Sequence, residues 1–101
     1  MSSIDEMKNQ FNIDDDFLSA LSDKTRQEII TFFYGTEEAC VSEIASRFTL
    51  SRPAISHHLI LMRKAKILNS RKEGKEMYYS FNKEYVVTQL ENLTRLIKKC
   101  C

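Results

Sequence analysis

The sequence predicts one mainly α-helical domain with a small β-hairpin, and three observations favour this fold class. The chain has 101 residues, which is the size of a single domain. Apolar residues make up 43% of it and charged residues 29%, a balance typical of globular chains. Only 2 Gly and 1 Pro are present, which favours helices with short connections. We therefore treat residues 1–101 as one domain, with about five helices and one two-stranded hairpin.

Apolar spacing predicts three helices in the first half of the chain. The first begins near Asp14, with acids in its first turn, after a stretch at residues 4–11 whose weaker periodicity allows a frayed helix. Ser22 or Asp23 caps the next helix, and Gly35 ends it. The third helix covers about residues 41–48, because its apolar residues recur at i, i+3, i+4 and i+7.

The second half of the chain predicts a helix, a hairpin and a last helix. Ser51 is a good N-cap, and Pro53 in the first turn costs no helical hydrogen bond. Over residues 68–81 the apolar period changes to two, and Gly74 suits a tight hairpin turn. The last helix, at about residues 83–99, has one apolar stripe that consists of Val86, Leu90, Leu93 and Ile97. Such a stripe suits a partner helix.

Residues 41–48 and the helix after Ser51 form two short helices joined by a short turn, which is the arrangement of a helix-turn-helix. With the hairpin that follows, the predicted fold is a winged helix-turn-helix. One face of the second helix is apolar, and the other carries Pro53, Ser56, His57, Ile60 and Lys64. Small or hydrogen-bonding side chains are what a helix needs to approach base edges in the major groove of DNA.

Charge is unevenly distributed along a chain whose formal net charge is only +1. Residues 1–23 are acidic, whereas residues 52–76 hold seven bases, which are Arg52, Arg63, Lys64, Lys66, Arg71, Lys72 and Lys75. Three of these bases flank the tip of the predicted hairpin, where they would neutralise phosphates. A solvated charged face explains the same residues equally well, so charge alone does not separate the two interpretations.

Four segments of the chain resemble motifs of ArsR/SmtB-family repressors, in the right order and spacing. They are residues 18–26, 41–45, 51–59 and 71–79, which resemble the opening motif, the first helix of the helix-turn-helix, the recognition helix and the wing. Lys24 departs from the pattern, because the family often has Pro there, and this should cost rigidity at the helix start without affecting function.

The resemblance implies a homodimeric repressor of double-stranded operator DNA, joined through about residues 4–21 and 83–99 and relieved by a ligand. Matched position by position, together with the basic residues, it predicts DNA contacts for Arg52, Pro53, Ser56, His57, Lys64, Arg71, Lys72 and Lys75. No run approaches the roughly 20 apolar residues that span a bilayer. The N-terminus has no signal-peptide pattern, so we expect a cytoplasmic protein without a membrane partner.

The effector of such a repressor stays open at this point. Relatives that sense thiophilic metals use a Cys-x-Cys at the first helix of the motif, but here the triplet is Cys40-Val41-Ser42. The zinc-sensing positions of other relatives hold Lys83, Tyr85, Leu96 and Lys99, which cannot build a zinc site. We expect no cofactor. The alternative is a sensor of a thiophilic metal or metalloid, or of oxidants, that uses Cys40, Cys100 and Cys101.

Other functions find little support in the sequence. His57 and His58 are adjacent, so on a helix they point about 100° apart and cannot chelate one metal ion. The chain has no phosphate loop, no HExxH and no paired-carboxylate signal of acid-base catalysis, so we do not expect an enzyme. The remaining alternative is a winged helix that binds another protein and no duplex. We expect His58 to be partly buried and hydrogen-bonded, and Tyr79 to belong to the core.

Overall fold

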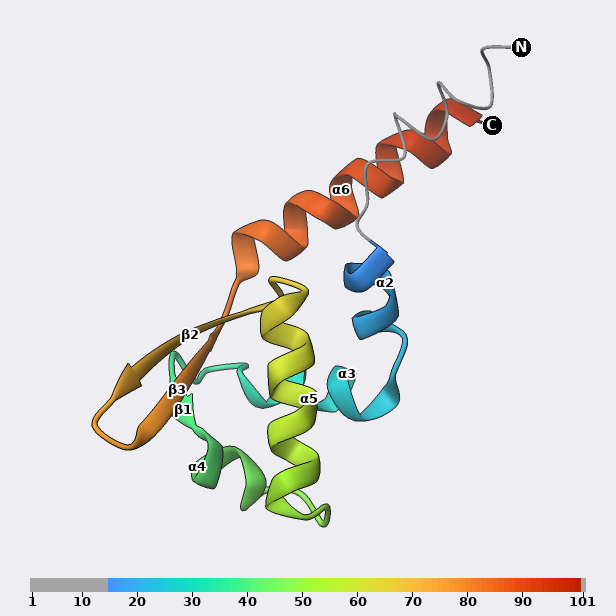
Figure 1. Ribbon diagram of the computed structural model, residues 1–101. Helices are drawn as coiled ribbons and strands as arrows, with labels where there is room; N and C mark the ends of the chain where they lie inside the picture. The colour runs from blue at the N-terminus through green and yellow to red at the C-terminus, as the bar shows by residue number, and fades with distance from the viewer. Residues whose placement is uncertain (1–14, 101) are drawn as a thin grey trace.

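The computed structural model describes residues 15–100, and its elements are labelled in Figure 1. In chain order they are α2 (Asp15–Leu21), α3 (Lys24–Phe32), β1 (Ala39–Cys40), α4 (Val41–Ala45), α5 (Arg52–Lys64), β2 (Leu68–Glu73), β3 (Glu76–Phe81) and α6 (Lys83–Cys100). The described residues therefore form five helices and one small antiparallel sheet, which confirms the predicted winged helix-turn-helix. The frayed helix expected at residues 4–11 lies outside the described residues.

The sheet has three strands in the order β1-β3-β2, so the prediction of a two-stranded wing was incomplete. β2 and β3 pair over six residues each, and Gly74 takes a positive φ of 62° in the turn between them. A positive φ is readily adopted by glycine, which explains its place at the tip. β1 adds only two pairs to β3, Ala39 with Tyr79 and Cys40 with Tyr78. A two-residue strand has no alternating pattern that the sequence could reveal.

Two side-chain caps start the helices where the sequence predicted. The carboxylate of Asp23 accepts a hydrogen bond from the backbone N–H of Arg26 at 3.1 Å. The hydroxyl of Ser51 accepts one from the backbone N–H of Ala54 at 3.3 Å. These bonds satisfy backbone donors that have no partner within the helix.

The third predicted helix is shorter than expected, because α4 ends at Ala45 rather than near Phe48. Beyond Ala45 the backbone tightens into turns, in which Phe48 N–H donates to Ala45 O at 3.1 Å. The hydroxyl of Ser46 also donates to Glu43 O at 2.6 Å, so it competes for a carbonyl that a longer helix would use.

α5 runs through the middle of the molecule and packs against α2, α3, α4 and β2 (Figure 1). Eight large side chains of the core are fully buried, namely Phe17, Ile29, Ile44, Ile55, Leu59, Met62, Ile67 and Leu68. Three of them come from one face of α5. Because this face is held by four other elements, the opposite face of α5 is fixed outward.

α5 is joined to the wing by a short, heavily bonded turn. Lys66 takes a positive φ of 65°, and its N–H donates to Arg63 O while Ile67 N–H donates to Met62 O, both at 2.9 Å. This pair of bonds is the Schellman motif, which ends many helices. Asn82, between β3 and α6, donates from its backbone to Ile67 O at 2.9 Å and from its side chain to Lys66 O at 3.0 Å. The end of α5, the start of β2 and the end of β3 are thus fastened together.

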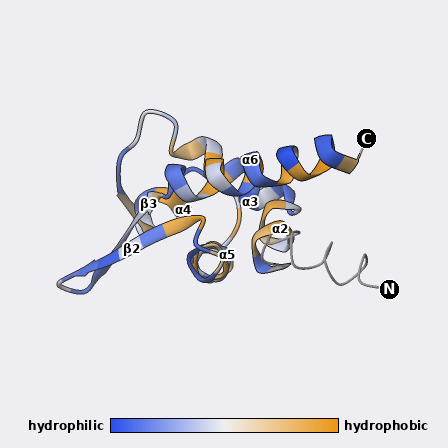
Figure 2. Cartoon of the chain, turned by 90° about the horizontal axis from the view of Figure 1, so that it is seen from above, coloured by the Kyte–Doolittle hydropathy of each residue, from blue (hydrophilic) through white to orange (hydrophobic). Residues whose placement is uncertain are grey.

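α6 extends away from the core, and Figure 2 shows apolar residues recurring along it. Its base is anchored by buried Val86 and by an edge-to-face contact between Tyr85 and Phe17, whose ring centroids lie 6.0 Å apart. Further along, Leu90 and Ile97 are 42% and 53% exposed. No helix among residues 15–100 is long and apolar enough to cross a membrane.

Candidate nucleic-acid interface

The outward face of α5 carries the residues that the sequence singled out. Arg52, Pro53, His57 and Lys64 are exposed, and Ser56 is half-buried between them and the core. The N-terminal half of the helix, where recognition helices contact base edges, holds Arg52, Pro53, Ser56 and His57. Lys64 lies twelve residues after Arg52, about 18 Å along the axis. The structure therefore groups Arg52, Pro53, Ser56 and His57, and sets Lys64 apart from them.

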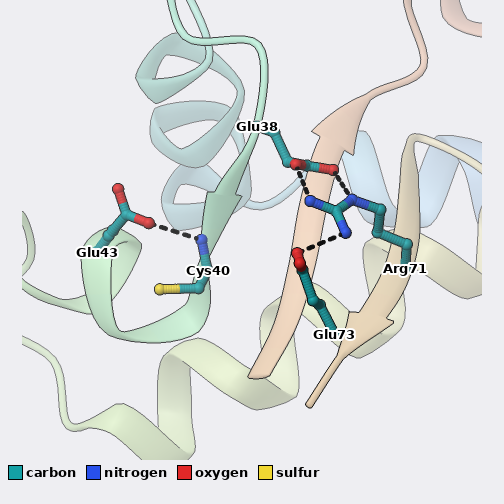
Figure 3. Close-up of polar contacts among 5 residues, drawn as sticks. All are labelled: Glu38, Cys40, Glu43, Arg71 and Glu73. Atoms are coloured by element: carbon teal, nitrogen blue, oxygen red, sulfur yellow. Dashed lines mark hydrogen bonds and ion pairs between the residues drawn. The ribbon is translucent and has the colours of Figure 1, made fainter. Parts of the chain in front are cut away.

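α4 braces this helix from behind. Its apolar residues Val41 and Ile44 are buried against the core, and α4 packs against α5. α4 begins directly after Cys40, whose N–H donates to the Glu43 carboxylate at 3.3 Å (Figure 3). A short buried helix that supports a partly exposed one is the geometry of a helix-turn-helix.

His58 points about 100° away from His57 along the helix and connects α5 to Arg26 of α3. Its Nδ1 lies 3.1 Å from Nη1 of Arg26. Because a guanidinium only donates, Nδ1 accepts and the neutral ring carries its proton on Nε2. Burial lowers the pKa of His58 below its usual value, whereas the charge of Asp23 acts in the opposite direction. The structure confirms the prediction of a partly buried, hydrogen-bonded histidine.

Arg26 is the centre of this connection, and sequence reasoning missed its role. Besides contacting His58, its Nε donates to Ala20 O at 2.8 Å and its Nη2 donates to Ser19 O at 3.2 Å. These carbonyls lie at the C-terminal end of α2, and the Ser19 carbonyl also accepts hydrogen bonds from the N–H and the hydroxyl of Ser22. Arg26 and His58 are 32 residues apart, so no local pattern could have linked them.

The wing presents its basic residues in two different ways. Figure 2 shows a hydrophilic tip, where Lys72 and Lys75 are exposed. Arg71 forms salt bridges with Glu38 at 2.6 Å and with Glu73 at 2.8 Å (Figure 3). Hydrogen bonds from Arg71 hold the pKa of the Glu38 carboxyl below its usual range, and those carboxylates raise the pKa of Arg71. Within residues 15–100, neither Lys72 nor Lys75 forms a salt bridge, whereas Arg71 is engaged by two acids.

The two cysteines among the described residues, Cys40 and Cys100, are not brought together within one chain. Cys40 is buried at the start of α4, and Cys100 is exposed at the end of α6. Figure 1 shows this end of α6 on the opposite side of the molecule from β1. Cys101 lies outside the described residues. Among residues 15–100, no group of three or more His, Cys, Asp or Glu side chains is placed to hold a metal ion.

Comparison with known proteins decides the family. Residues 23–70 match the bacterial regulatory proteins of the arsR family. The chain is also 31% identical over 80 residues to the transcriptional repressor SdpR of Bacillus subtilis, a match that covers 79% of this chain and 88% of that protein. The protein belongs to the arsR family. The predicted family is thus confirmed, and with it the function of a DNA-binding transcriptional regulator.

Two further similarities extend this result. The transcriptional activator HlyU of Vibrio cholerae is 33% identical over 79 residues, which cover 78% of this chain and 72% of HlyU. Among solved structures, an ArsR-like transcriptional regulator from Rhodococcus sp. RHA1 superposes with a TM-score of 0.74 at 30% identity, covering 83% of this chain and 76% of that one. The arsR-family fold therefore extends beyond the segment that defines the family.

Proposed function

We propose that this arsR-family protein is a homodimeric repressor that binds a specific duplex operator through the outward face of α5. The single observation that supports this most is the grouping of Arg52, Pro53, Ser56 and His57 on that face, while the opposite face of the helix is fully buried. A helix held in this way presents two hydrogen-bonding side chains and one cation to a major groove without rearranging.

We assign the residues of this interface to two tasks. His57 and Ser56 read base edges, and Arg52 at the helix N-terminus contacts guanine or phosphate. Lys72 and Lys75 at the wing tip, together with Lys64, contact phosphates and carry no sequence information. In a dimer, two copies of α5 would read half-sites separated by one or more helical turns of DNA.

The exposed stripe on α6 supports the homodimer. Val87, Leu90 and Ile97 are each at least 40% exposed, and they recur on one side of the helix. An apolar stripe of this kind is stabilised when a second helix covers it. Leu90→Glu should shift the protein from dimer to monomer in analytical ultracentrifugation across a dilution series. Thr88→Glu, on the opposite side of α6, should leave the dimer intact, and equal behaviour of both variants would rule out this interface.

A comparison of His57→Ala with Lys75→Ala tests the interface. The wild-type protein first selects its operator from a pool of random duplexes, and affinities for this duplex and for a random one are then measured by fluorescence anisotropy. His57→Ala should weaken operator binding by about 1–3 kcal/mol and leave random binding nearly unchanged. Lys75→Ala should weaken both alike and lower the slope of log K against log salt by about one.

Two results would contradict the proposal. Equal loss on both duplexes for His57→Ala would remove His57 from base reading. A wild-type protein that enriches no duplex at low ionic strength would favour the protein-interaction module instead. Lys24→Ala serves as the control, because Lys24 is an exposed cation that belongs to α3 rather than to α5 or the wing, and should change neither affinity.

A further inference from the structure

The side chain of Arg71 spans the small sheet from one edge to the other. Arg71 lies on β2, and Glu38 directly precedes β1, while β3 runs between these two edge strands. Neighbouring strands are about 4.8 Å apart, so the edges are separated by about 10 Å. The guanidinium crosses this distance over the ring of Tyr78, the cross-strand partner of Arg71, with its central carbon 4.8 Å from the ring centroid.

All three guanidinium nitrogens of Arg71 have carboxylate partners. Nε donates to Glu38 Oε2 at 2.6 Å, and Nη2 donates to Glu38 Oε1 at 2.7 Å, which makes this pair bidentate. Nη1 donates to Glu73 Oε2 at 2.8 Å (Figure 3). Bidentate pairs and charge networks are the surface ion pairs that contribute measurably to a structure. With its donors directed at two acids, Arg71 offers little charge to a phosphate.

At this point, the backbone connection between the wing and the helix-turn-helix consists only of the pairing between β1 and β3. β1 forms only two pairs with β3, and α4 begins at Val41, immediately after it. Glu38 is two residues upstream of Cys40, so the Arg71–Glu38 pair adds a second attachment beside those two pairs. This attachment joins the outer strand of the wing to the segment that leads into the bracing helix.

We propose that Arg71 is a positioning residue for DNA binding, which fixes the wing against the segment before α4 through Glu38, while Lys72 and Lys75 make the wing's phosphate contacts. The inference rests on the proposed function and revises the expectation that Arg71 itself contacts DNA. Its partner Glu38 is a carboxylate that strengthens binding to a polyanion, because it holds a cationic hairpin in place.

Glu38→Gln provides a test in which two explanations predict opposite signs. If Glu38 acts only through its charge, removing an acid near the interface should tighten DNA binding. If it positions the wing, Glu38→Gln should weaken operator binding about three- to fivefold, as expected for loss of one networked ion pair. Glu37→Gln is the matched control, since Glu37 is exposed, makes the same charge change and has no recorded contact with Arg71 among the described residues.

Arg71→Gln separates positioning from phosphate contact. The affinity should fall to the same extent as in Glu38→Gln, while the slope of log K against log salt should stay at the wild-type value. Lys75→Ala, by comparison, should lower this slope by about one. The double variant Glu38→Arg with Arg71→Glu restores an ion pair with its charges exchanged, and should recover most of the lost affinity. Thermal unfolding followed by circular dichroism checks that each variant is folded.

The nuclear magnetic resonance signal of Arg71 Nε–H reports on the attachment without DNA. It should exchange slowly with water in the wild type and in Glu37→Gln, and quickly in Glu38→Gln. A slope reduced by one in Arg71→Gln, or a Glu38→Gln protein that binds as tightly as Glu37→Gln, would overturn the positioning role while leaving the proposed function intact. Failure of the wild type to bind any duplex would instead overturn the proposed function.

Discussion

Arg26 should contribute more to stability than its position on a surface helix suggests, and Arg26→Met tests this. Methionine keeps much of the length of the side chain but removes its donors. Three acceptors then lose a partner, namely Ala20 O, Ser19 O and His58 Nδ1. The bonds to Ala20 and His58 are partly buried and contribute about 1 kcal/mol each, whereas water replaces the exposed bond to Ser19. We expect a loss of about 2 kcal/mol in the free energy of unfolding.

Urea unfolding followed by far-ultraviolet circular dichroism measures this loss, since the chain contains no Trp for a fluorescence signal. A protein of this size loses about 1–3 kcal/mol of stability per molar urea, so the midpoint should fall by about 1 M. All samples need the same protein concentration, because the proposed dimer formation would shift apparent stability. Lys24→Met removes an exposed cation from the same helix and should change stability by less than about 0.5 kcal/mol. An Arg26→Met midpoint equal to that of Lys24→Met would refute the reasoning.

Two further predictions concern α5. Because burial lowers the folded-state pKa of His58, the unfolded chain takes up the proton first. The stability that the neutral ring contributes is therefore complete above about pH 6.5 and is lost as the pH falls below that value. His58→Asn keeps an acceptor for Arg26, so urea titrations from pH 7.5 to 5.5 should show less pH dependence than in the wild type, and identical profiles would contradict the assignment. The charged or titratable groups near His58 are Asp23, Arg26 and His57. The pKa of Asp23 is lowered mainly by its hydrogen bond with the Arg26 backbone. The stability that Asp23 contributes is lost only below its usual pKa of 3.8, outside the pH range of these titrations. Leu59→Ala removes a fully buried side chain and should cost about 2–5 kcal/mol in thermal unfolding, whereas Ile60→Ala at the neighbouring, 37% exposed position should cost far less; similar losses would place the core elsewhere.

The elements that the sequence predicted well are those with strong local signals. The Ser51 cap, the apolar face of α5 and the Gly74 turn each depend on residues a few positions apart, and each is present in the structure. β1 was missed because its two residues are held by pairing with β3 rather than by any pattern of their own. The end of α4 was placed too late, because the apolar period continues to Phe48 although the helical bonds do not.

For the candidate interface, the outward residues of α5 could be predicted from the sequence, but the ion-pair partners of its cations could not. The spacing of apolar and polar residues along α5 already predicts which side chains point outward. Which cations remain free depends on contacts across the chain, such as Arg71 with Glu38, 33 residues apart. The same limit applies to Arg26 and His58. A sequence shows that arginines are present, but the fold determines what each of them contacts.

The turn at Lys66 leaves no hinge between α5 and the ribbon beside it. Its Schellman bonds close the helix, and Asn82, which directly follows β3, fastens the same turn to the base of the ribbon. Helix and ribbon are consequently held in a fixed orientation relative to one another, while α5 itself stays packed against α2, α3 and α4. A change in the angle between the helix and the ribbon therefore has to break the two bonds that Asn82 donates.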